Sequence, residues 1–497
     1  MIAEAGRAEA AAYNAAMQRL QNYLAGEQCP AQAGRTLDVW EPAAGQVYAQ
    51  APDSDAADVD AAVRAAAAAF PAWRDTAAGE RARVLNRIAD LVERDLEAFA
   101  QAESRDTGKP LALARTLDIP RAVSNLRFFA AAATQFASEA HAMEEGAVNY
   151  TLRQPLGAVG CISPWNLPLY LFTWKIAPAL AAGNAVVAKP SEVTPLTAAM
   201  LAERCIEAGL PPGLLNVVHG GAAAGGALVA HPDVRAVSFT GGTETGRRIA
   251  AAAAPSFKKL TLELGGKNPS IVFADCDFET ALEGAVRAAF ANQGEICLCG
   301  SRVLVEASVY DRFRDAFVER ARALRVGDPL EAATDQGALV SEAHLARVLA
   351  AVERARAAGG NVLCGGARAT VASPRCRDGW FMQPTVIDGL PPDAAANQDE
   401  IFGPVCTLIP FADEVEAVRI ANGTAYGLAA TVWSRDVQKC HRVAAQLQSG
   451  LVWINTWMLR DLRVPMGGMK SSGVGREGGW EAMRFFTEAK NVCLKYG

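Results

Sequence analysis

Strand and helix patterns alternate along residues 156–264, and this alternation restricts the fold more than any other feature of the chain. Short runs rich in β-branched residues predict strands at 156–162, 184–190, 214–218, 235–240 and 258–264. Amphipathic stretches predict helices between them, at 169–183, 195–209, 223–231 and 243–253. Strands and helices that alternate at this spacing form a parallel sheet, and ligands bind at the carboxyl ends of its strands.

The segments on either side carry patterns of their own. Before residue 140, apolar positions recur every three or four residues and predict helices at 53–73, 79–108 and 119–138, with Gly108 as the stop signal of the second. After Glu263 a second α/β segment begins, with strands expected at 269–274, 301–306, 361–366, 381–388, 406–411, 430–434 and 449–455. Residues 147–155 and 491–497 are expected to be exposed strands outside both cores. Because exposed strand edges need pairing or cover, we interpret these two as an oligomerisation arm.

Charge and composition argue against several classes of partner. The net charge is −6 at pH 7 and no run of Lys or Arg is present, so a nucleic-acid or anionic-membrane partner is not expected. Uncharged stretches at 155–174 and 208–232 are interrupted by prolines, glycines and asparagines, and neither is predicted to span a membrane. Residues 1–20 mix acids with bases and lack the apolar core of a signal peptide. We therefore expect a cytoplasmic protein.

The eleven cysteines raise a separate question. An odd number without paired spacing is not a disulfide framework, and with five histidines, none near residue 297, no metal site is predicted. Most of the cysteines are therefore expected to be small buried hydrophobic residues. Cys297 and Cys299 stand one residue apart in FANQGEICLCG, and the residues alone leave open whether one of them attacks a substrate.

Two strand ends carry residues suited to a dinucleotide. Lys189, at the end of one predicted strand, can hold a ribose or a phosphate, and Glu192 can accept hydrogen bonds from ribose hydroxyls. An acid there would repel a 2′-phosphate, which favours NAD over NADP. The Gly241–Gly246 turn opens a helix, and its glycines would let a pyrophosphate approach the helix N-terminus. The spacing is not GxGxxG, so an ordinary glycine-capped turn is an equal alternative at this point.

Two further strand ends carry candidate catalytic groups. Glu263 is a candidate general base, with a solvated loop acid as the alternative interpretation. Asn166 lies in SPWNLP, whose two prolines stiffen the turn, and its amide N–H can stabilise an oxyanion. Loss of one such donor typically costs about 3–4 kcal/mol of transition-state stabilisation. An ordinary turn asparagine is the alternative.

Seven motifs occur in a fixed order between residues 163 and 477: SPWNLP, KPSEVTP, FTGGTETG, LELGGKNP, FANQGEIC, EIFGPV and PMGGMKSSGVGRE. In this order and spacing the chain resembles the aldehyde dehydrogenase superfamily over nearly its whole length. The resemblance implies that Cys297 is the nucleophile and that Glu263 activates the deacylating water. It implies an oxyanion hole formed by Asn166 and the backbone N–H of Cys297.

The resemblance also implies NAD as cofactor. The cofactor-binding positions that it indicates are Ile162, Ser163, Trp165, Lys189, Glu192, Gly241, Gly242, Gly246, Leu264, Glu400 and Phe402, with Glu400 at the nicotinamide ribose. In the implied reaction a thiolate attacks an aldehyde, the thiohemiacetal passes a hydride to NAD, and water hydrolyses the thioester. Cys299 is then a packing neighbour, with a reversible disulfide to Cys297 as the alternative. Glu295 stands where many members have glutamine.

The implied fold is α/β with three parts. A Rossmann-like NAD-binding domain comprises residues 1–141 and 158–264, a second α/β catalytic domain comprises 265–482, and a small β arm comprises 142–157 and 483–497. The arm would mediate a homodimer or a homotetramer.

Three segments bear on the substrate: LDIPRAVSNLRFFA, NQGEICLC and WMLRDLRVPMGG. They resemble the branch of the family that acts on muconic semialdehydes, particularly 2-aminomuconic 6-semialdehyde, which is oxidised to 2-aminomuconate. These substrates carry a carboxylate remote from the aldehyde, and a guanidinium can bind it bidentately. Arg121 and Arg460 match the positions implied for this role, with Arg463 as a second candidate. Alternatively, Arg460 pairs with Asp461 or faces water.

Other functions stay open at this stage. The nearest rival substrate is 2-hydroxymuconic semialdehyde, which differs only in an enol oxygen. More distant rivals are a general ω-carboxylate aldehyde and a betaine-type aldehyde, although paired arginines oppose a cationic substrate. A CoA-acylating enzyme is disfavoured by Glu263, which hydrolytic members retain for the water step. A binding or structural protein that had lost catalysis would lack the cysteine, the glutamate or the asparagine, and all three are present.

Overall fold

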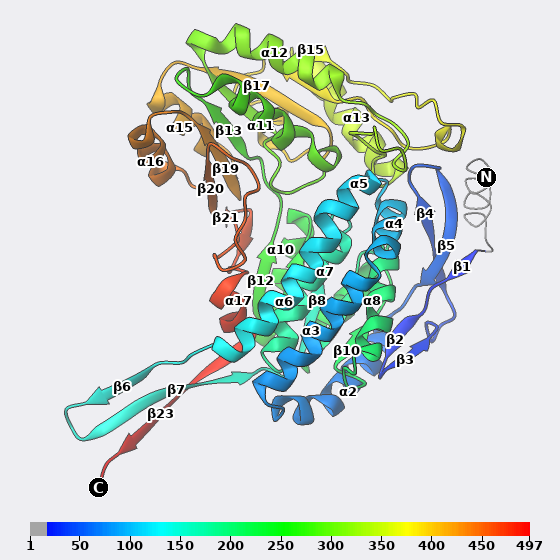
Figure 1. The fold of residues 1–497 in the computed structure, drawn as a ribbon, viewed down its shortest axis with the longest axis vertical. Helices are drawn as coiled ribbons and strands as arrows, with labels where there is room; N and C mark the ends of the chain where they lie inside the picture. The colour runs from blue at the N-terminus through cyan, green and yellow to red at the C-terminus, as the bar shows by residue number, and fades with distance from the viewer. Residues whose placement is uncertain (1–16) are drawn as a thin grey trace.

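The computed structural model describes residues 17–497, which form two lobes and a projecting arm (Figure 1). The sheet of the larger lobe has the strand order β22-β12-β11-β8-β9-β10-β2-β3. In that order the strands are Gly473–Val474, Lys259–Glu263, Val234–Thr240, Ala158–Ile162, Ala185–Lys189, Leu215–Val217, Asn22–Leu24 and Glu27–Cys29. The strands from β12 to β10 are parallel, which confirms the parallel sheet predicted for residues 156–264.

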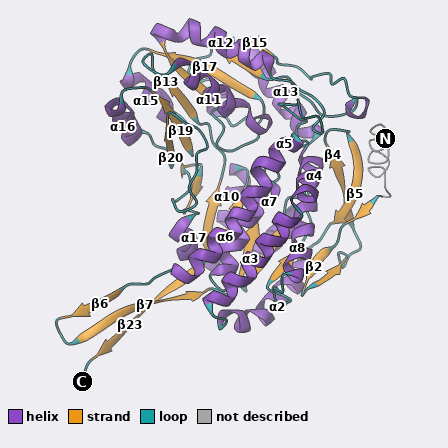
Figure 2. Ribbon diagram, viewed as in Figure 1, coloured by secondary structure: helices purple, strands orange, loops and turns teal. Residues whose placement is uncertain are grey.

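Helices cover both faces of this sheet (Figure 2). One face is covered by α2 (Ala56–Arg74), α9 (Ala222–Ala230) and α10 (Thr243–Ala253), and the other by α7 (Pro168–Ala181) and α8 (Leu196–Glu207). Outside α7 lie α3 (Ala78–Arg94) and α6 (Ile119–Gln135). Every residue of α7 is buried, as expected for a largely apolar helix that lies between two layers.

The single helix predicted over 79–108 is wrong. The structure divides it at Asp95, whose ψ of 21° ends α3, and a second helix, α4, runs over Leu96–Thr107. The Asp95 carboxylate accepts a hydrogen bond from Arg204 Nε on α8 at 2.6 Å, so a tertiary contact fixes the break. The predicted stop at Gly108 is confirmed, since its φ of 78° lies in the left-handed region that glycine adopts without strain.

The smaller lobe is built on a sheet of order β15-β16-β17-β14-β13-β19-β20. These strands are Asn361–Cys364, Thr385–Asp388, Val405–Phe411, Arg302–Glu306, Pro269–Val272, Ala429–Trp433 and Leu451–Ile454. Its helices are α11 (Phe278–Phe290), α12 (Tyr310–Ala323), α13 (Glu342–Ala357), α14 (Ala395–Gln398), α15 (Glu414–Asn422) and α16 (Val437–Gln446). Each predicted strand is present, although the one expected over 381–388 begins only at Thr385, after Pro384, which has no N–H to donate to a neighbouring strand.

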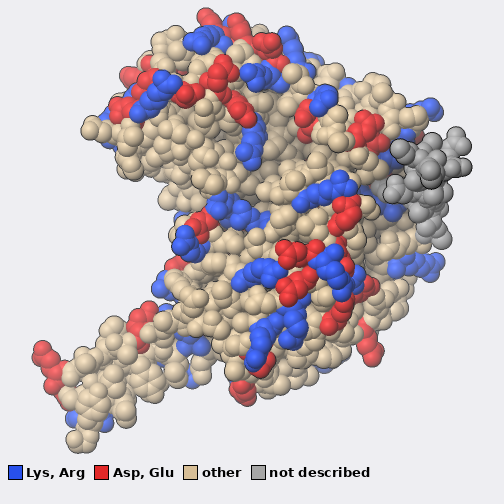
Figure 3. Space-filling model, viewed as in Figure 1, with Lys and Arg blue, Asp and Glu red and all other residues tan. Residues whose placement is uncertain are grey.

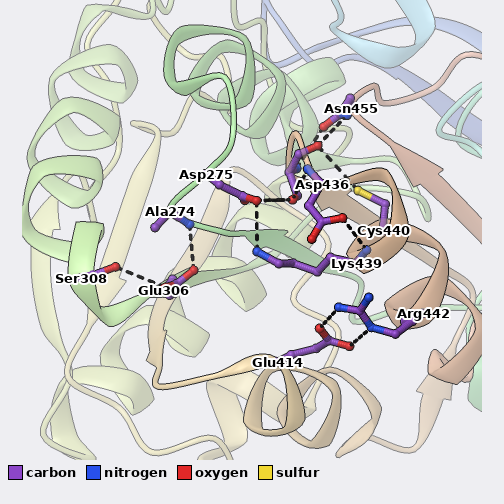
Figure 4. Close-up of polar contacts among 11 residues, drawn as sticks. Ala274, Asp275, Glu306, Ser308, Glu414, Asp436, Lys439, Cys440, Arg442 and Asn455 are labelled. Carbon is purple, nitrogen blue, oxygen red and sulfur yellow. Dashed lines mark hydrogen bonds and ion pairs between the residues drawn. The ribbon is translucent and has the colours of Figure 1, made fainter.

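Side-chain bonds fix the turns at one edge of this second sheet (Figure 4). The Asp275 carboxylate, just after β13, accepts from Lys439 Nζ at 3.1 Å. Asp436 caps α16 by accepting from the backbone N–H of Lys439 at 3.0 Å. The Arg442 guanidinium on α16 pairs with Glu414 on α15 at 2.9 Å. These contacts join α16 to the end of β13 and α15 to α16.

Several N-terminal strands were not predicted. A three-stranded sheet is formed by strands β1 (Gln18–Arg19), β5 (Gln46–Pro52) and β4 (Thr36–Glu41). Strands β2 and β3 extend the larger sheet. Strands β4 and β5 pair as an antiparallel hairpin. The alternating side chains of TLDVWE and the turn that follows it are a usable strand signal that the helical pattern further along the chain obscured.

The predicted exposed strands pair with each other in the projecting arm (Figure 1). Strand β7 (Ala147–Pro155) pairs antiparallel with β23 (Thr487–Lys495) along its whole length, and β6 (Ala140–Met143) lies on the other edge of β7. Apolar side chains are exposed on the arm, among them Leu152 and Leu494, and few charges are visible on it in Figure 3. The helix before β23 is α17 (Gly479–Phe485).

The remaining described elements are short. Strands β18 (Tyr426–Gly427) and β21 (Met469–Lys470) form a two-stranded pair, and α5 covers Leu111–Leu113. Across residues 17–497, no helix is both long enough and apolar enough to cross a membrane. The exact domain boundaries stay a prediction.

Candidate active site

The sheet of the larger lobe brings four strand ends to one edge. Its register pairs Ile162 with Lys189 and with Phe239, and pairs Thr240 with Glu263. The chain order reverses at β8, because β9 and β10 lie on one side of it and β11 and β12 on the other. A crevice opens at such a reversal, and this is where open parallel sheets bind ligands.

A tight loop carries Cys297 to this edge. After α11 the chain turns through Asn292 and Gln293, both in the left-handed region with φ of 51° and 56°, and then through Gly294 with φ 70°. A Cβ on Gly294 would lie 2.1 Å from the carbonyl oxygen of Gly403, so this turn packs backbone against backbone and requires glycine. The left-handed turn at residues 292–294 therefore fixes the position of the loop that carries Cys297.

Asn268 holds the same loop from the other side. Its Nδ2 donates to the carbonyl oxygens of Cys297 and Cys299 at 2.7 and 2.9 Å, and its Oδ1 accepts from the Ala429 N–H at 3.0 Å. Trp457 Nε1 donates to the Leu298 carbonyl at 3.0 Å. Sequence reasoning assigned no role to either residue, although LELGGKNP, which contains Asn268, was a usable signal.

Asn166 lies beside the cysteine loop and is 4% exposed. Its Nδ2 donates to the Glu295 carbonyl at 2.9 Å, and because an amide nitrogen carries two hydrogens, the second can serve a ligand. The backbone carbonyl oxygen of Asn166 accepts hydrogen bonds from Lys109 Nζ at 2.9 Å and from Asn292 Nδ2 at 3.2 Å. Lys109 also pairs with the carboxylate of Asp118. Sequence reasoning identified Asn166 but neither Lys109 nor Asp118.

Glu263 ends β12 and is 3% exposed, so the alternative of a solvated loop acid is wrong. Neither of its carboxylate oxygens has a hydrogen-bond partner among the described residues. Burial raises the pKa of the Glu263 carboxyl well above its usual range, the charge of Glu477 raises it further, and Lys175 opposes the rise. A buried carboxyl whose oxygens have no hydrogen-bond partner can accept a proton from a bound water and so act as a general base.

A buried polar chain stands next to Glu263. Lys175 Nζ donates to Glu477 Oε1 at 2.8 Å and to Ser238 Oγ at 3.0 Å, and the Ser238 hydroxyl donates to the same Glu477 oxygen at 2.9 Å. Sequence reasoning missed all three, because the partners lie up to 302 residues apart in the chain.

The two cysteines of the loop differ in their surroundings. Both are free thiols; Cys297 is partly exposed, whereas Cys299 is buried and directs its Sγ–H to the Ala291 carbonyl at 3.9 Å. Burial raises the pKa of the Cys299 thiol to about 12. Burial, and then the charges of Glu263 and Glu400, raise the pKa of the Cys297 thiol, and the Arg460 guanidinium opposes this. Cys299 is thus a packing residue in this structure.

Several residues expected to bind the cofactor lie at the ends of β8, β11 and β12. Ile162 and Ser163 are buried at the end of β8, and Gly242 is the N-cap residue of α10. The N–H of Gly241 donates to the Glu263 carbonyl at 3.0 Å. A Cβ on Gly246 would lie 2.5 Å from Leu264 Cδ2, so α10 can approach the β12 end only with glycine here.

The surroundings of this turn fit a dinucleotide. The hydroxyl of Thr240 is buried without a hydrogen-bond partner among residues 17–497, directly before the turn. Lys189 Nζ lies 3.3 Å from Glu192 Oε2, and the Glu192 side chain is 45% exposed, so its oxygens remain open to a ribose. An orphaned hydroxyl beside a helix N-terminus is suited to a pyrophosphate.

Two further expected cofactor residues, Glu400 and Phe402, come from the smaller lobe. Glu400 Oε1 accepts from the Gly266 N–H at 2.9 Å, and burial raises the pKa of the Glu400 carboxyl to about 7. The rings of Trp165 and Phe402 meet edge to face at 5.3 Å, and Phe402 has a left-handed φ of 60°. His344, which sequence reasoning missed, directs Nε2 to the Phe402 carbonyl at 2.7 Å and lies 3.4 Å from the Glu295 carboxylate.

Two of the three predicted arginines come together at Tyr170. Arg460 Nη1 donates to the Tyr170 hydroxyl at 2.7 Å, and the Arg121 guanidinium lies 5.8 Å from the centroid of the Tyr170 ring. Arg463 is elsewhere: its side chain is 80% exposed and pairs with Asp461 at 2.5 Å. Asp461 is thus the partner of Arg463, which counts against the alternative that it pairs with Arg460.

Comparison with known proteins agrees with this geometry. The model of the aldehyde dehydrogenase family matches residues 29–492. The 2-aminomuconic semialdehyde dehydrogenase of Danio rerio is 52% identical over 480 residues, covering 96% of this chain and 98% of that protein. The 2-hydroxymuconic semialdehyde dehydrogenase of Pseudomonas sp. (strain CF600) is 46% identical over 486 residues, covering 96% and 100%.

The solved structure of an aldehyde dehydrogenase from Bacillus cereus in complex with NAD+ matches this one with a TM-score of 0.94 at 38% identity, covering 98% of this chain and 99% of that chain. The chain therefore belongs to the aldehyde dehydrogenase family. It is an aldehyde dehydrogenase, and the predicted fold is confirmed.

Arg460→Gln is expected to slow alkylation of Cys297 by iodoacetamide several-fold at each pH between 7 and 9. Loss of the guanidinium removes a positive charge that opposes the raised pKa of the Cys297 thiol, so less thiolate is present. The rate is measured by mass spectrometry of the peptide that contains Cys297. Arg463→Gln is the matched control and should alkylate at the wild-type rate. A Cys297 rate that Arg460→Gln leaves unchanged would contradict this electrostatic assignment.

Proposed function

We propose that the protein is an NAD-dependent, hydrolytic aldehyde dehydrogenase whose substrate is a semialdehyde with a remote carboxylate. The best supported reaction is oxidation of 2-aminomuconic 6-semialdehyde to 2-aminomuconate. The observation that carries the substrate class is the pair of guanidiniums at Tyr170, with Arg460 at its hydroxyl and Arg121 near its ring. The Arg460 guanidinium also lowers the pKa of both Cys297 and Glu263, so the proposed carboxylate-binding group lies within electrostatic reach of the proposed catalytic groups.

The residues around Cys297 suit attack on an aldehyde. The Cys297 sulfur forms a bond to the aldehyde carbon, and negative charge moves to the aldehyde oxygen. The second N–H of the Asn166 amide and the Cys297 backbone N–H donate to that oxygen. NAD supplies the hydride acceptor when it is bound. Its proposed contacts are Ile162, Ser163, Trp165, Lys189, Glu192, Gly241, Gly242, Gly246, Leu264, Glu400 and Phe402.

Glu263 is the proposed base for the second half of the reaction. Its carboxylate takes a proton from water, the resulting hydroxide adds to the thioester carbon, and the carbon–sulfur bond breaks to release the carboxylic acid. The Glu263 carboxyl must first lose its own proton. Lys175 and Glu477, joined at 2.8 Å, lie near enough to influence that proton. Because a CoA-acylating enzyme needs no such base, Glu263 supports the hydrolytic reaction.

A second candidate substrate is 2-hydroxymuconic semialdehyde, which the 46% identical Pseudomonas relative is named for. Both candidates carry the remote carboxylate, so the two arginines accommodate either one. Identity of 52% to the Danio rerio relative favours the amino compound.

Assembly and location are also proposals. The arm exposes apolar side chains that include Tyr150, Leu152 and Leu494, and a homodimer or a homotetramer would bury them. The cytoplasm remains the location expected from the sequence.

Glu263→Gln is expected to lower the rate of thioester hydrolysis by about 10²–10⁴-fold, the usual contribution of a general base. In the wild type the pKa of Glu263 is raised, so its carboxylate forms only above that pKa and hydrolysis should accelerate as the pH rises. Single-turnover rates between pH 6 and 10 measure this dependence. The variant should lose the rising limb, and a variant that kept it would show that another group is the base.

Arg460→Ala should raise the KM for 2-aminomuconic 6-semialdehyde by about 10–100-fold, since hydrogen bonds to a charged group contribute about 1.5–3 kcal/mol. The KM for a neutral aliphatic aldehyde should change little. Steady-state NADH formation gives both values, with Arg463→Ala as the matched control that changes neither. An equal rise of KM for both substrates would remove the carboxylate assignment, and a wild type that prefers the neutral aldehyde would overturn the proposed substrate class.

A further inference from the structure

One buried ammonium group connects the two ends of the proposed substrate site. Lys109 Nζ donates to the Asn166 carbonyl at 2.9 Å and pairs with the carboxylate of Asp118. The side chains of Lys109 and Asp118 are both 0% exposed. Asn166 is the proposed donor to the aldehyde oxygen, and Asp118 leads into the helix that carries Arg121.

The backbone between Asp118 and Arg121 is continuous helix. Residues Ala114–Asp118 form a π-helical turn, and α6 begins at the next residue, Ile119. Arg121 is thus three residues beyond Asp118, within one helical turn. Single π-helical turns occur frequently at functional sites, where they reset the position of the residues that follow. A contact that fixes Asp118 therefore also fixes the start of α6.

The contacts of Asn166 fix the orientation of its side chain. Its backbone carbonyl accepts hydrogen bonds from Lys109 and Asn292, while its side-chain Nδ2 donates to the Glu295 backbone carbonyl at 2.9 Å. With the backbone and one amide N–H held, the direction of the second N–H is determined. Loss of the Lys109 bond would release the backbone and let that direction change.

Electrostatics does not make this ion pair a strong source of stability. Both charges have lost their water, and Asp118 Oδ1 has no hydrogen-bond partner among the described residues. Replacing such a buried pair with apolar residues of similar size is often neutral or stabilising, whereas removal of one partner is strongly destabilising. The geometry that the pair imposes is therefore its more informative property.

We propose that Lys109 is a positioning residue that sets the separation between Asn166 and Arg121. By holding both elements it selects semialdehydes according to the distance between their aldehyde and carboxylate groups. This inference rests on the proposed function, because it takes Asn166 and Arg121 as the contacts of those two groups.

The test compares the wild type with the double variant Lys109→Met/Asp118→Leu, which removes both partners of the ion pair together instead of leaving one of them unpaired. The measured quantity is the ratio of kcat/KM for 2-hydroxymuconic semialdehyde to kcat/KM for propanal, which has no carboxylate. We expect this ratio to fall at least tenfold in the double variant. The melting temperature and the affinity for NAD, followed by quenching of protein fluorescence, should stay near the wild-type values.

Thr116→Ala is the matched control, because Thr116 lies in the same π-helical turn but is exposed and bonds only to the local Ala112 carbonyl. Its ratio should equal that of the wild type. If the double variant does not fold, Asp118→Asn weakens the same bridge with little change of shape and should also lower the ratio.

A folded double variant with an unchanged ratio, whether both substrates lose activity equally or neither does, would overturn the role of Lys109. Failure of the proposed function has a different signature, since the wild-type ratio would then already be close to one.

Discussion

The side chain of Asn268 is the contact on which the geometry of the site depends most. It lies between the last parallel strand of the larger sheet and the first strand of the second sheet, and it binds the carbonyls of Cys297 and Cys299 at 2.7 and 2.9 Å. Its oxygen accepts from the Ala429 N–H at 3.0 Å, so the amide is held in one orientation. The cysteine loop is thereby fixed to Ala429 of β19 in the second sheet, and the chain before Asn268 leads back to Glu263 at the end of β12 in the larger one.

Burial gives the site its chemical character. It is the first cause of the raised pKa of both the Cys297 thiol and the Glu263 carboxyl, so the resting site favours the neutral form of each. A charge on Glu263 would raise the pKa of Cys297 further. The two groups are therefore suited to act in turn, with the thiolate needed for attack on the aldehyde and the carboxylate only later, for water. Arg460 is the nearby positive charge that favours the first step.

The sequence predicted most of the parallel sheet and the residues at its carboxyl edge, because both depend on local periodicity and on the turns after strands. Prediction from the sequence failed for features that depend on contacts between residues far apart in the chain. The helix break at Asp95 depends on Arg204, and the roles of Lys109, Lys175 and His344 depend on partners from other elements. Arg463 lies in the same loop as Arg460 but pairs with Asp461 at the surface. The spacing of residues in the sequence does not predict that these two side chains point in different directions.

The most direct test of the account is to trap the covalent intermediate. Glu263→Gln would be mixed with NAD and 2-hydroxymuconic semialdehyde, quenched in acid and analysed by peptide mass spectrometry. The account predicts a mass increase equal to the muconic acyl group on Cys297, with about one NADH formed per site in a rapid burst. An acyl group on Cys299, or NADH formation without an adduct on Cys297, would contradict the assignment of Cys297 as the nucleophile.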